Sequence, residues 1–112
     1  MVGYSAGGVA SAALSWSRGR HQDASADFRR LLEIRPSDAS TLQNLHLIER
    51  ELGNWQEAAE FGALACELRP LAAACPFTLA ETYGRLRRYG DAQRAMDRYL
   101  ELQASIEDPG TV

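Results

Sequence analysis

The stretch LLEIRP at residues 31–36 decides the fold, because it returns 34 residues later as ACELRP at residues 65–70. The same offset relates GRHQDA at residues 19–24 to GNWQEA at residues 53–58, and then to RRYGDA at residues 87–92. Three copies of one unit therefore fill most of the 112-residue chain. A helical unit of this length cannot bury its apolar face alone, so such units stack into a solenoid that presents a surface. This organisation favours binding over catalysis.

Each unit is predicted to be two helices joined by a tight turn. In the second unit apolar residues recur at three- and four-residue steps until Gly53 interrupts the pattern and Trp55 begins another helix. Pro70 ends that second helix, because proline cannot continue a helix and disfavours the helical conformation of the residue before it. Asp38 offers an N-cap oxygen to a helix that begins near Ala39.

Composition and charge exclude several classes of protein. All 12 basic residues are arginine, and 15 acidic residues leave a net charge of −3, which gives no field that attracts phosphate backbones. No apolar run approaches the roughly 20 residues that span a bilayer. A secretory signal needs a basic residue ahead of its apolar region, and none precedes the Ala/Gly/Ser-rich residues 2–16. We expect no nucleic-acid or membrane partner, no cofactor, no metal site and a cytoplasmic location.

The two cysteines give no sign of a metal site. Cys66 and Cys75 lie nine residues apart, without the Cys-x-x-Cys spacing or the nearby histidines that zinc needs. Cys66 occupies the register of Leu32 and Leu100, which are apolar residues of the other two units. We therefore expect both cysteines to be small core residues with reduced thiols.

The repeat resembles the tetratricopeptide repeat (TPR), a helix pair with a glycine at the internal turn, an aromatic residue soon after it, then an alanine and a terminal proline. The second unit matches through Leu42, Leu45, Gly53, Trp55, Ala58, Ala65 and Pro70. The third unit departs from the pattern with Arg87 in place of the turn glycine. The resemblance implies a single all-α domain, a right-handed solenoid of about six helices with repeats near 5–38, 39–72 and 73–106 and a flexible tail at 107–112.

In TPR proteins the first helices of successive units line a concave groove that holds a peptide or a helix of another protein. The resemblance therefore implies a non-enzymatic protein-interaction module. The residues expected to face the groove are Ala6, Val9, Ala13, Trp16, Gln43, Asn44, Leu47, Arg50, Phe77, Thr78, Glu81 and Arg85. Leu47 and Phe77 are the expected central contacts. The alternative for these two side chains is that they pack between units.

Other roles stay open beside this one. The chain is also similar to small bacterial TPR chaperones that hold a secreted or assembling subunit, and it could be the regulatory TPR arm of a larger enzyme. After Ser105 we expect no extra solvating helix of the kind that often follows the last repeat, and an end without a polar cap exposes apolar surface. Self-association through these uncapped ends is therefore a further expectation.

A Gly-x-Ser-x-Gly motif at residues 3–7 raises the alternative of a serine hydrolase. That motif works where a strand and a sharp turn lift the serine towards a histidine. Only Met1 and Val2 precede it here, and no alternating strand pattern follows. The two histidines, His21 and His46, both have places in the repeat, and we expect His46 to be a packed neutral ring. We therefore expect no catalytic residue.

One register holds alanine in all three units, at Ala24, Ala58 and Ala92. Where two helices cross closely only a small side chain fits, and extra methylenes at such a contact cost about 1–3 kcal/mol. We predict that Ala58→Leu lowers the melting temperature by several degrees, measured by circular dichroism. An unchanged melting curve would mean that the helices do not cross closely at this residue.

Overall fold

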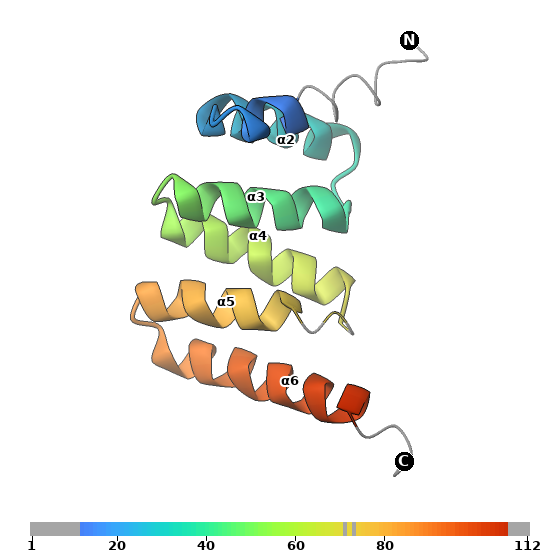
Figure 1. Ribbon diagram of the computed structural model, residues 1–112, viewed down its shortest axis with the longest axis vertical. Coiled ribbons are helices and arrows are strands. Elements are labelled where there is room, and N and C mark those ends of the chain that lie inside the picture. Colours follow the sequence, from blue (N-terminus) through green and yellow to red (C-terminus); the bar gives the residue numbers. More distant parts are fainter. Residues whose placement is uncertain (1–11, 71, 73, 108–112) are drawn as a thin grey trace.

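The computed structural model describes residues 12–70, 72 and 74–107, and in them the chain is a stack of helices without any strand. Residues 12–17 form a helical segment. The helices that follow are α2 (His21–Ile34), α3 (Ala39–Glu51), α4 (Trp55–Leu68), α5 (Ala74–Arg85) and α6 (Tyr89–Glu107). They lie one after another in chain order along the longest axis of the molecule (Figure 1). The predicted all-α solenoid is confirmed.

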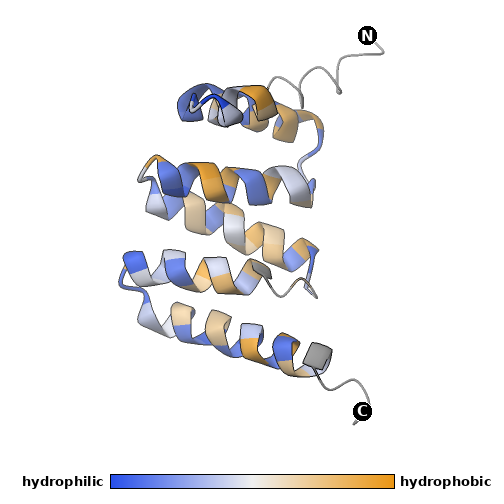
Figure 2. Cartoon of the chain, in the orientation of Figure 1, coloured by the Kyte–Doolittle hydropathy of each residue, from blue (hydrophilic) through white to orange (hydrophobic). Residues whose placement is uncertain are grey.

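Packing follows the order of the chain, because each helix from α2 to α6 lies against the next one. Each helix carries both hydrophobic and hydrophilic residues (Figure 2). In the described part of the chain, many of the buried apolar residues belong to one of two clusters. The first contains Ala12, Ala24, Phe28, Leu45 and Ile48, and the second contains Leu42, Ala65 and Cys75. The core is therefore thin, and small side chains make up much of it.

The local signals in the second unit place its helices as predicted. The Asp38 carboxylate accepts hydrogen bonds from the backbone N–H groups of Ser40 and Thr41, at 3.1 and 3.3 Å, and α3 begins at Ala39. These bonds satisfy donors that the first turn of a helix leaves without partners. The second helix of the unit, α4, begins at Trp55. Ala58, in the first turn of α4, is fully buried, as the alanine register predicts.

His46 fits into the core because its neighbour across the unit is a glycine. The other two units have Ala12 and Ala80 at the register of His46. The residues at the register of Gly62 in those units are Phe28 and Met96. A Cβ atom on Gly62 would lie 2.7 Å from the His46 ring. At this contact the second unit has its large side chain, His46, on its first helix and its small residue, Gly62, on its second helix, which reverses the order in the other two units. The two helices of the second unit therefore need not move apart.

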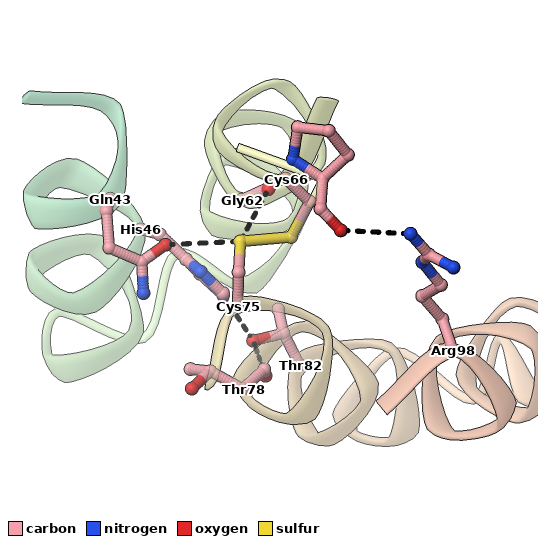
Figure 3. The surroundings of a disulfide bond; sticks show 9 residues. Gln43, His46, Gly62, Cys66, Cys75, Thr78, Thr82 and Arg98 are labelled. Carbon is pink, nitrogen blue, oxygen red and sulfur yellow. Dashed lines mark hydrogen bonds between the residues drawn. A yellow bond between two sulfur atoms is a disulfide. The ribbon is translucent and has the colours of Figure 1, made fainter. Parts of the chain in front are cut away.

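The expectation of reduced cysteines is wrong, because Cys66 and Cys75 form a disulfide (Figure 3). The last turn of α4 and the first turn of α5 face each other across the short connection that contains Pro70, and the two Cα atoms are 5.7 Å apart. That separation is within the range of disulfides. Closing a loop of this length stabilises the folded chain by up to about 3 kcal/mol. The prediction considered the register of Cys66 and overlooked that the two helix ends meet.

The turn inside each unit passes through a backbone conformation that favours glycine. The φ angle is +76° at Gly19, +81° at Gly53 and +60° at Arg87, so the third unit makes the same turn with a side chain present. A residue with a Cβ atom pays roughly 1–2 kcal/mol for this left-handed conformation. The departure at Arg87 that the sequence displays is therefore a strained turn.

We predict that Arg87→Gly raises the free energy of unfolding by about 0.5–1 kcal/mol. Glycine removes the backbone strain of the left-handed conformation, and this gain exceeds the destabilisation that comes from the greater conformational entropy of glycine in the unfolded chain. Gly53→Ala is the matched reverse change and should lower it. Nothing lies within 4 Å of a Cβ atom at Gly53, so this variant reports the backbone conformation alone. Urea denaturation measures both, and equal stability of Arg87→Gly and the wild type would contradict the prediction.

Candidate functional site

Both tryptophans of the chain line one hollow on the surface. Its volume is about 340 Å³, and its lining residues are Trp16, Leu47, Arg50, Glu51 and Trp55. They belong to the helical segment 12–17, to α3 and to the first residue of α4. We call this hollow the tryptophan pocket. It brings together the first unit and both helices of the second.

Trp16 is held in place on two sides. Its indole Nε1–H donates a hydrogen bond to Glu51 Oε2 at 3.3 Å. Its ring meets Phe28 edge-on, with the ring centroids 6.3 Å apart and the planes at 89°. His21 Nε2 contacts the same Glu51 oxygen, and His21 Nδ1 lies 3.0 Å from the carbonyl oxygen of Gly19. Contacts within the chain therefore hold the Trp16 ring in place at the pocket.

Trp55 is held by two arginines from different units. The guanidinium carbons of Arg50 and Arg85 lie 5.9 and 5.2 Å from its ring centroid, within the range of cation–π contacts. Arg50 also lies 3.8 Å from a carboxylate oxygen of Glu81. At partly exposed positions each cation–π contact contributes about 0.5–1 kcal/mol. Trp55 therefore links α3 with α5 through charged side chains that remain partly exposed.

Five of the residues predicted to face the groove gather at this pocket. Trp16, Leu47 and Arg50 line it, and Glu81 and Arg85 reach it through their contacts with Arg50 and Trp55. Leu47 is half-buried.

The other predicted groove residues lie elsewhere. Phe77 is 41% exposed and packs against Tyr99 of α6, with the ring centroids 5.0 Å apart. Gln43 lies beside the disulfide, with its Oε1 atom 3.7 Å from Cys75 Sγ (Figure 3). The structure leaves Ala13 exposed and Asn44 and Thr78 half-buried. Ala6 and Val9 lie outside the described residues.

Sequence reasoning missed Trp55 and Glu51 as lining residues. Trp55 begins the second helix of its unit, whereas the predicted groove was assigned to the first helix of each unit. Glu51 lies one helical turn after Leu47, and residues at this spacing share a face of the helix. That spacing could have identified Glu51, whereas the position of Trp55 depends on how the turn places the start of α4.

A buried carboxylate anchors α3, the helix that carries Leu47 and Arg50. Glu49 is 1% exposed, and its oxygens accept hydrogen bonds from Ser25 Oγ at 2.9 Å, Arg29 Nη2 at 2.7 Å and Asn54 Nδ2 at 3.0 Å. Burial alone would raise the pKa of Glu49, but the hydrogen bonds from Arg29, Asn54 and Ser25 outweigh it and lower the pKa. Arg29 also bonds Glu57 at 2.5 Å. The network joins α2, α3 and α4.

His46 is fully buried, and its hydrogen bonds indicate which ring nitrogen carries the proton. Its Nε2 atom lies 2.8 Å from Thr82 Oγ1, and Thr82 Oγ1 donates its own proton to the carbonyl oxygen of Thr78 at 3.1 Å. Nε2–H is therefore the donor to Thr82, and Nδ1 stays a buried acceptor without a partner in the described residues. Burial, and then the charge of Arg50, lower the pKa of His46 to about 4. The expected packed neutral ring is confirmed.

Other kinds of site find no support in the part of the chain that the structure describes. There, no group of three or more His, Cys, Asp or Glu side chains could hold a metal ion. Nor does any helix in that part have the length and apolar character to cross a membrane. The Gly-x-Ser-x-Gly motif lies outside the described residues. The two histidines that a hydrolase could use are engaged, His21 with Glu51 and His46 with Thr82.

The architecture is that of a tetratricopeptide-repeat protein. Among solved structures, MamA (AMB-1) is 18% identical over 87% of this chain with a TM-score of 0.81, and MamA (MSR-1) is 18% identical over 87% with a TM-score of 0.78. The TPR2B domain of yeast Sti1, solved in complex with pHsp70, is 15% identical over 96% of this chain and 86% of its own, with a TM-score of 0.80.

The chain spans about half the length of these MamA chains, 53% and 56%. No family model and no curated protein matches the sequence. At such low identities the likeness concerns the fold, and the TPR fold expected from the repeat is confirmed.

We predict that the free energy of unfolding falls as the pH drops from about 6.5 towards 4. Histidine in the unfolded chain titrates near 6.5, whereas the pKa of His46 in the folded protein is about 4. The unfolded state therefore binds the proton first, and stability is lost as the pH falls through this window. Between pH 7 and pH 5 the expected loss from His46 is about 2 kcal/mol.

His46→Gln provides the control, since its amide can still donate to Thr82 but does not titrate. The pKa of Glu49 is lowered from its usual value of 4.5, so the stability that Glu49 contributes is lost only when the pH falls below that value. Any loss of stability between pH 7 and pH 5 is therefore assigned to His46. Urea unfolding of both proteins at the two pH values measures the difference. Parallel pH profiles for the wild type and His46→Gln would contradict the prediction.

Proposed function

We propose that the chain is a non-enzymatic protein-interaction module that binds a peptide or a helix of a partner protein along α3 and α5, anchored in the tryptophan pocket. The observation that carries this proposal is the gathering of Trp16, Trp55, Arg50 and Arg85 around one hollow. Tryptophan and arginine are enriched among the residues that supply most of the energy of protein interfaces. The likeness of the fold to the Sti1 domain, which was solved with pHsp70, supports a protein as the partner.

The chemistry of the pocket favours an apolar anchor side chain on the partner. Its lining includes the rings of Trp16 and Trp55, the aliphatic side chain of Leu47, and the polar side chains of Arg50 and Glu51. The partner would insert an apolar side chain, and its backbone would bond to the polar side chains. Because hydrogen bonds and cation–π contacts already order both tryptophans, binding would cost little side-chain entropy.

The groove would extend from the pocket along α5. Phe77 offers a second apolar contact, since 41% of it is exposed and Tyr99 supports its ring. Gln43 and Asn44, both half-buried on α3, carry amides that suit the backbone of an extended partner. Two apolar anchors with amides nearby would accept a peptide or one face of an amphipathic helix.

The proposal is tested by capturing partners from native cell extract with tagged wild type, Leu47→Asp and Leu64→Asp. Leu64 on α4 is 49% exposed and lies outside the pocket, so Leu64→Asp places the same charge away from the site. A partner specific to the pocket should be lost from Leu47→Asp and retained by Leu64→Asp, after circular dichroism shows that both variants fold. Phe77→Asp asks separately whether the contact extends along α5.

Direct binding is then measured by tryptophan fluorescence with the purified captured protein. The only two tryptophans of the chain line the pocket, so a change in emission reports this site. A partner bound equally by wild type and Leu47→Asp, with unchanged emission, would overturn the proposal. The state of the captured protein separates the two non-enzymatic roles, because an assembly chaperone holds an unassembled subunit and an adaptor binds a folded complex.

A further inference from the structure

We propose that the Cys66–Cys75 disulfide is a reversible, redox-controlled link that holds α5 against α4, and that its reduction loosens the third unit while the solenoid stays folded. This inference concerns the junction between the second and third units and does not depend on what the groove binds. It rests on a comparison of two junctions within the same chain, on the different exposure of the two cysteine residues, and on the surroundings of Cys75.

The first junction of the chain has the same helix ends without a covalent bond. At the first junction, Leu32 stands at the repeat position of Cys66, and Thr41 stands at the repeat position of Cys75. The helix before that junction, α2, ends at Ile34, in the same register as the end of α4, and Leu32 packs with the buried cluster around Leu42. The fold therefore forms this kind of junction by packing alone, and the disulfide is an addition to it.

The two cysteine residues differ in how exposed they are to an attacking thiol. Cys66 is partly exposed, whereas Cys75 is 6% exposed and is the second residue of α5. A thiolate of the glutathione class would attack Cys66 Sγ, form a mixed disulfide there and release Cys75 as a thiolate. Cys66 is the sulfur attacked because its residue is the more exposed of the two, and Cys75 leaves at the N-terminal end of α5, where the helix dipole favours a negative charge.

The reaction is then completed by a second thiol. It attacks the sulfur of the attached small thiol and releases Cys66 as a thiolate. In total, two small thiols become one disulfide, and Cys66 and Cys75 gain two electrons and two protons. Formation of the bond is the reverse of these steps, with the oxidised small thiol as the acceptor of the electrons.

The surroundings of Cys75 suit the reduced state as well as the disulfide. In the disulfide its sulfur carries no proton and lies 3.7 Å from Gln43 Oε1 and 3.9 Å from the carbonyl oxygen of Gly62 (Figure 3). A thiol at the same place could donate to either oxygen, so reduction would leave no buried donor without a partner. Neither redox state is therefore penalised at this position.

Reduction should loosen α5 without releasing it, because other contacts remain. The buried His46 ring still bonds Thr82, and Arg85 still lies over Trp55. Since α5 also carries Phe77, a looser α5 would disturb the part of the surface that this helix contributes. The redox state would thus act on one side of the groove and leave α2 and α3 unchanged.

Hydrogen–deuterium exchange of the whole chain, with and without dithiothreitol, tests the inference. The amides of α5 should exchange about tenfold or more faster after reduction, and those of α2 should not change. A disulfide that closes a loop of this length changes the unfolding equilibrium constant by at most on the order of a hundredfold, which sets the upper limit of the expected increase in exchange. The reduced chain should keep its far-ultraviolet circular dichroism while its melting temperature falls by roughly 10 °C.

The matched control is the double variant Cys66→Leu, Cys75→Thr, which reproduces the residues of the first junction. This variant should fold, its α5 amides should exchange as fast as those of the reduced wild type, and dithiothreitol should not change their exchange. Equal exchange of α5 in oxidised and reduced wild type would overturn the inference, and so would loss of the helical signal on reduction. Thiols that remain open to alkylation in the folded chain after equilibration with oxidised glutathione would overturn it too. No partner is used, so these outcomes are independent of the proposed function.

Discussion

The structure depends on one constraint, which is that each helix can bury its apolar face only against its neighbours in the stack. The core is therefore thin, and alanines such as Ala58 are among its fully buried residues. In so thin a core the polar residues become decisive. Among the described residues, the largest fully buried side chains are Leu45, Ile48, His46, Glu49 and Thr82, and three of these five are polar. Each needs a partner at a fixed position, so hydrogen bonds set how neighbouring helices are placed.

This arrangement also explains why the candidate site lies on α3. Within a little over one turn, His46 and Glu49 are buried and bonded to neighbouring helices, while Leu47 and Arg50 line the tryptophan pocket. The buried pair fixes the rotation of the helix about its axis, and the rotation determines where the pocket residues point. A binding surface held in this way needs little rearrangement to meet a partner.

Local signals made most of the fold predictable from the sequence. The Asp38 cap and the start of α4 at Trp55 follow from residues within one turn of each boundary. The disulfide and the place of Trp55 in the pocket depend on which helix ends meet in space. The position of a single residue within the repeat does not contain that information. Of the candidate site, the residues of α3 and α5 were predictable as one helix face, whereas their meeting with Trp55 was not.

Two departures from the internal repeat in the core of the second unit occur as compensated pairs. His46 is accommodated by Gly62, and the carboxylate of Glu49, at the register of Ser15 and Tyr83, is neutralised by Arg29 of the preceding unit. An unpaired change at such a place would leave a void, a clash or a buried charge without a partner. These pairs are concentrated in the second unit, which also carries most of the pocket. The second unit, which matches the family pattern in both of its helices, is thus the most specialised in its core, as expected where the core must hold a particular surface.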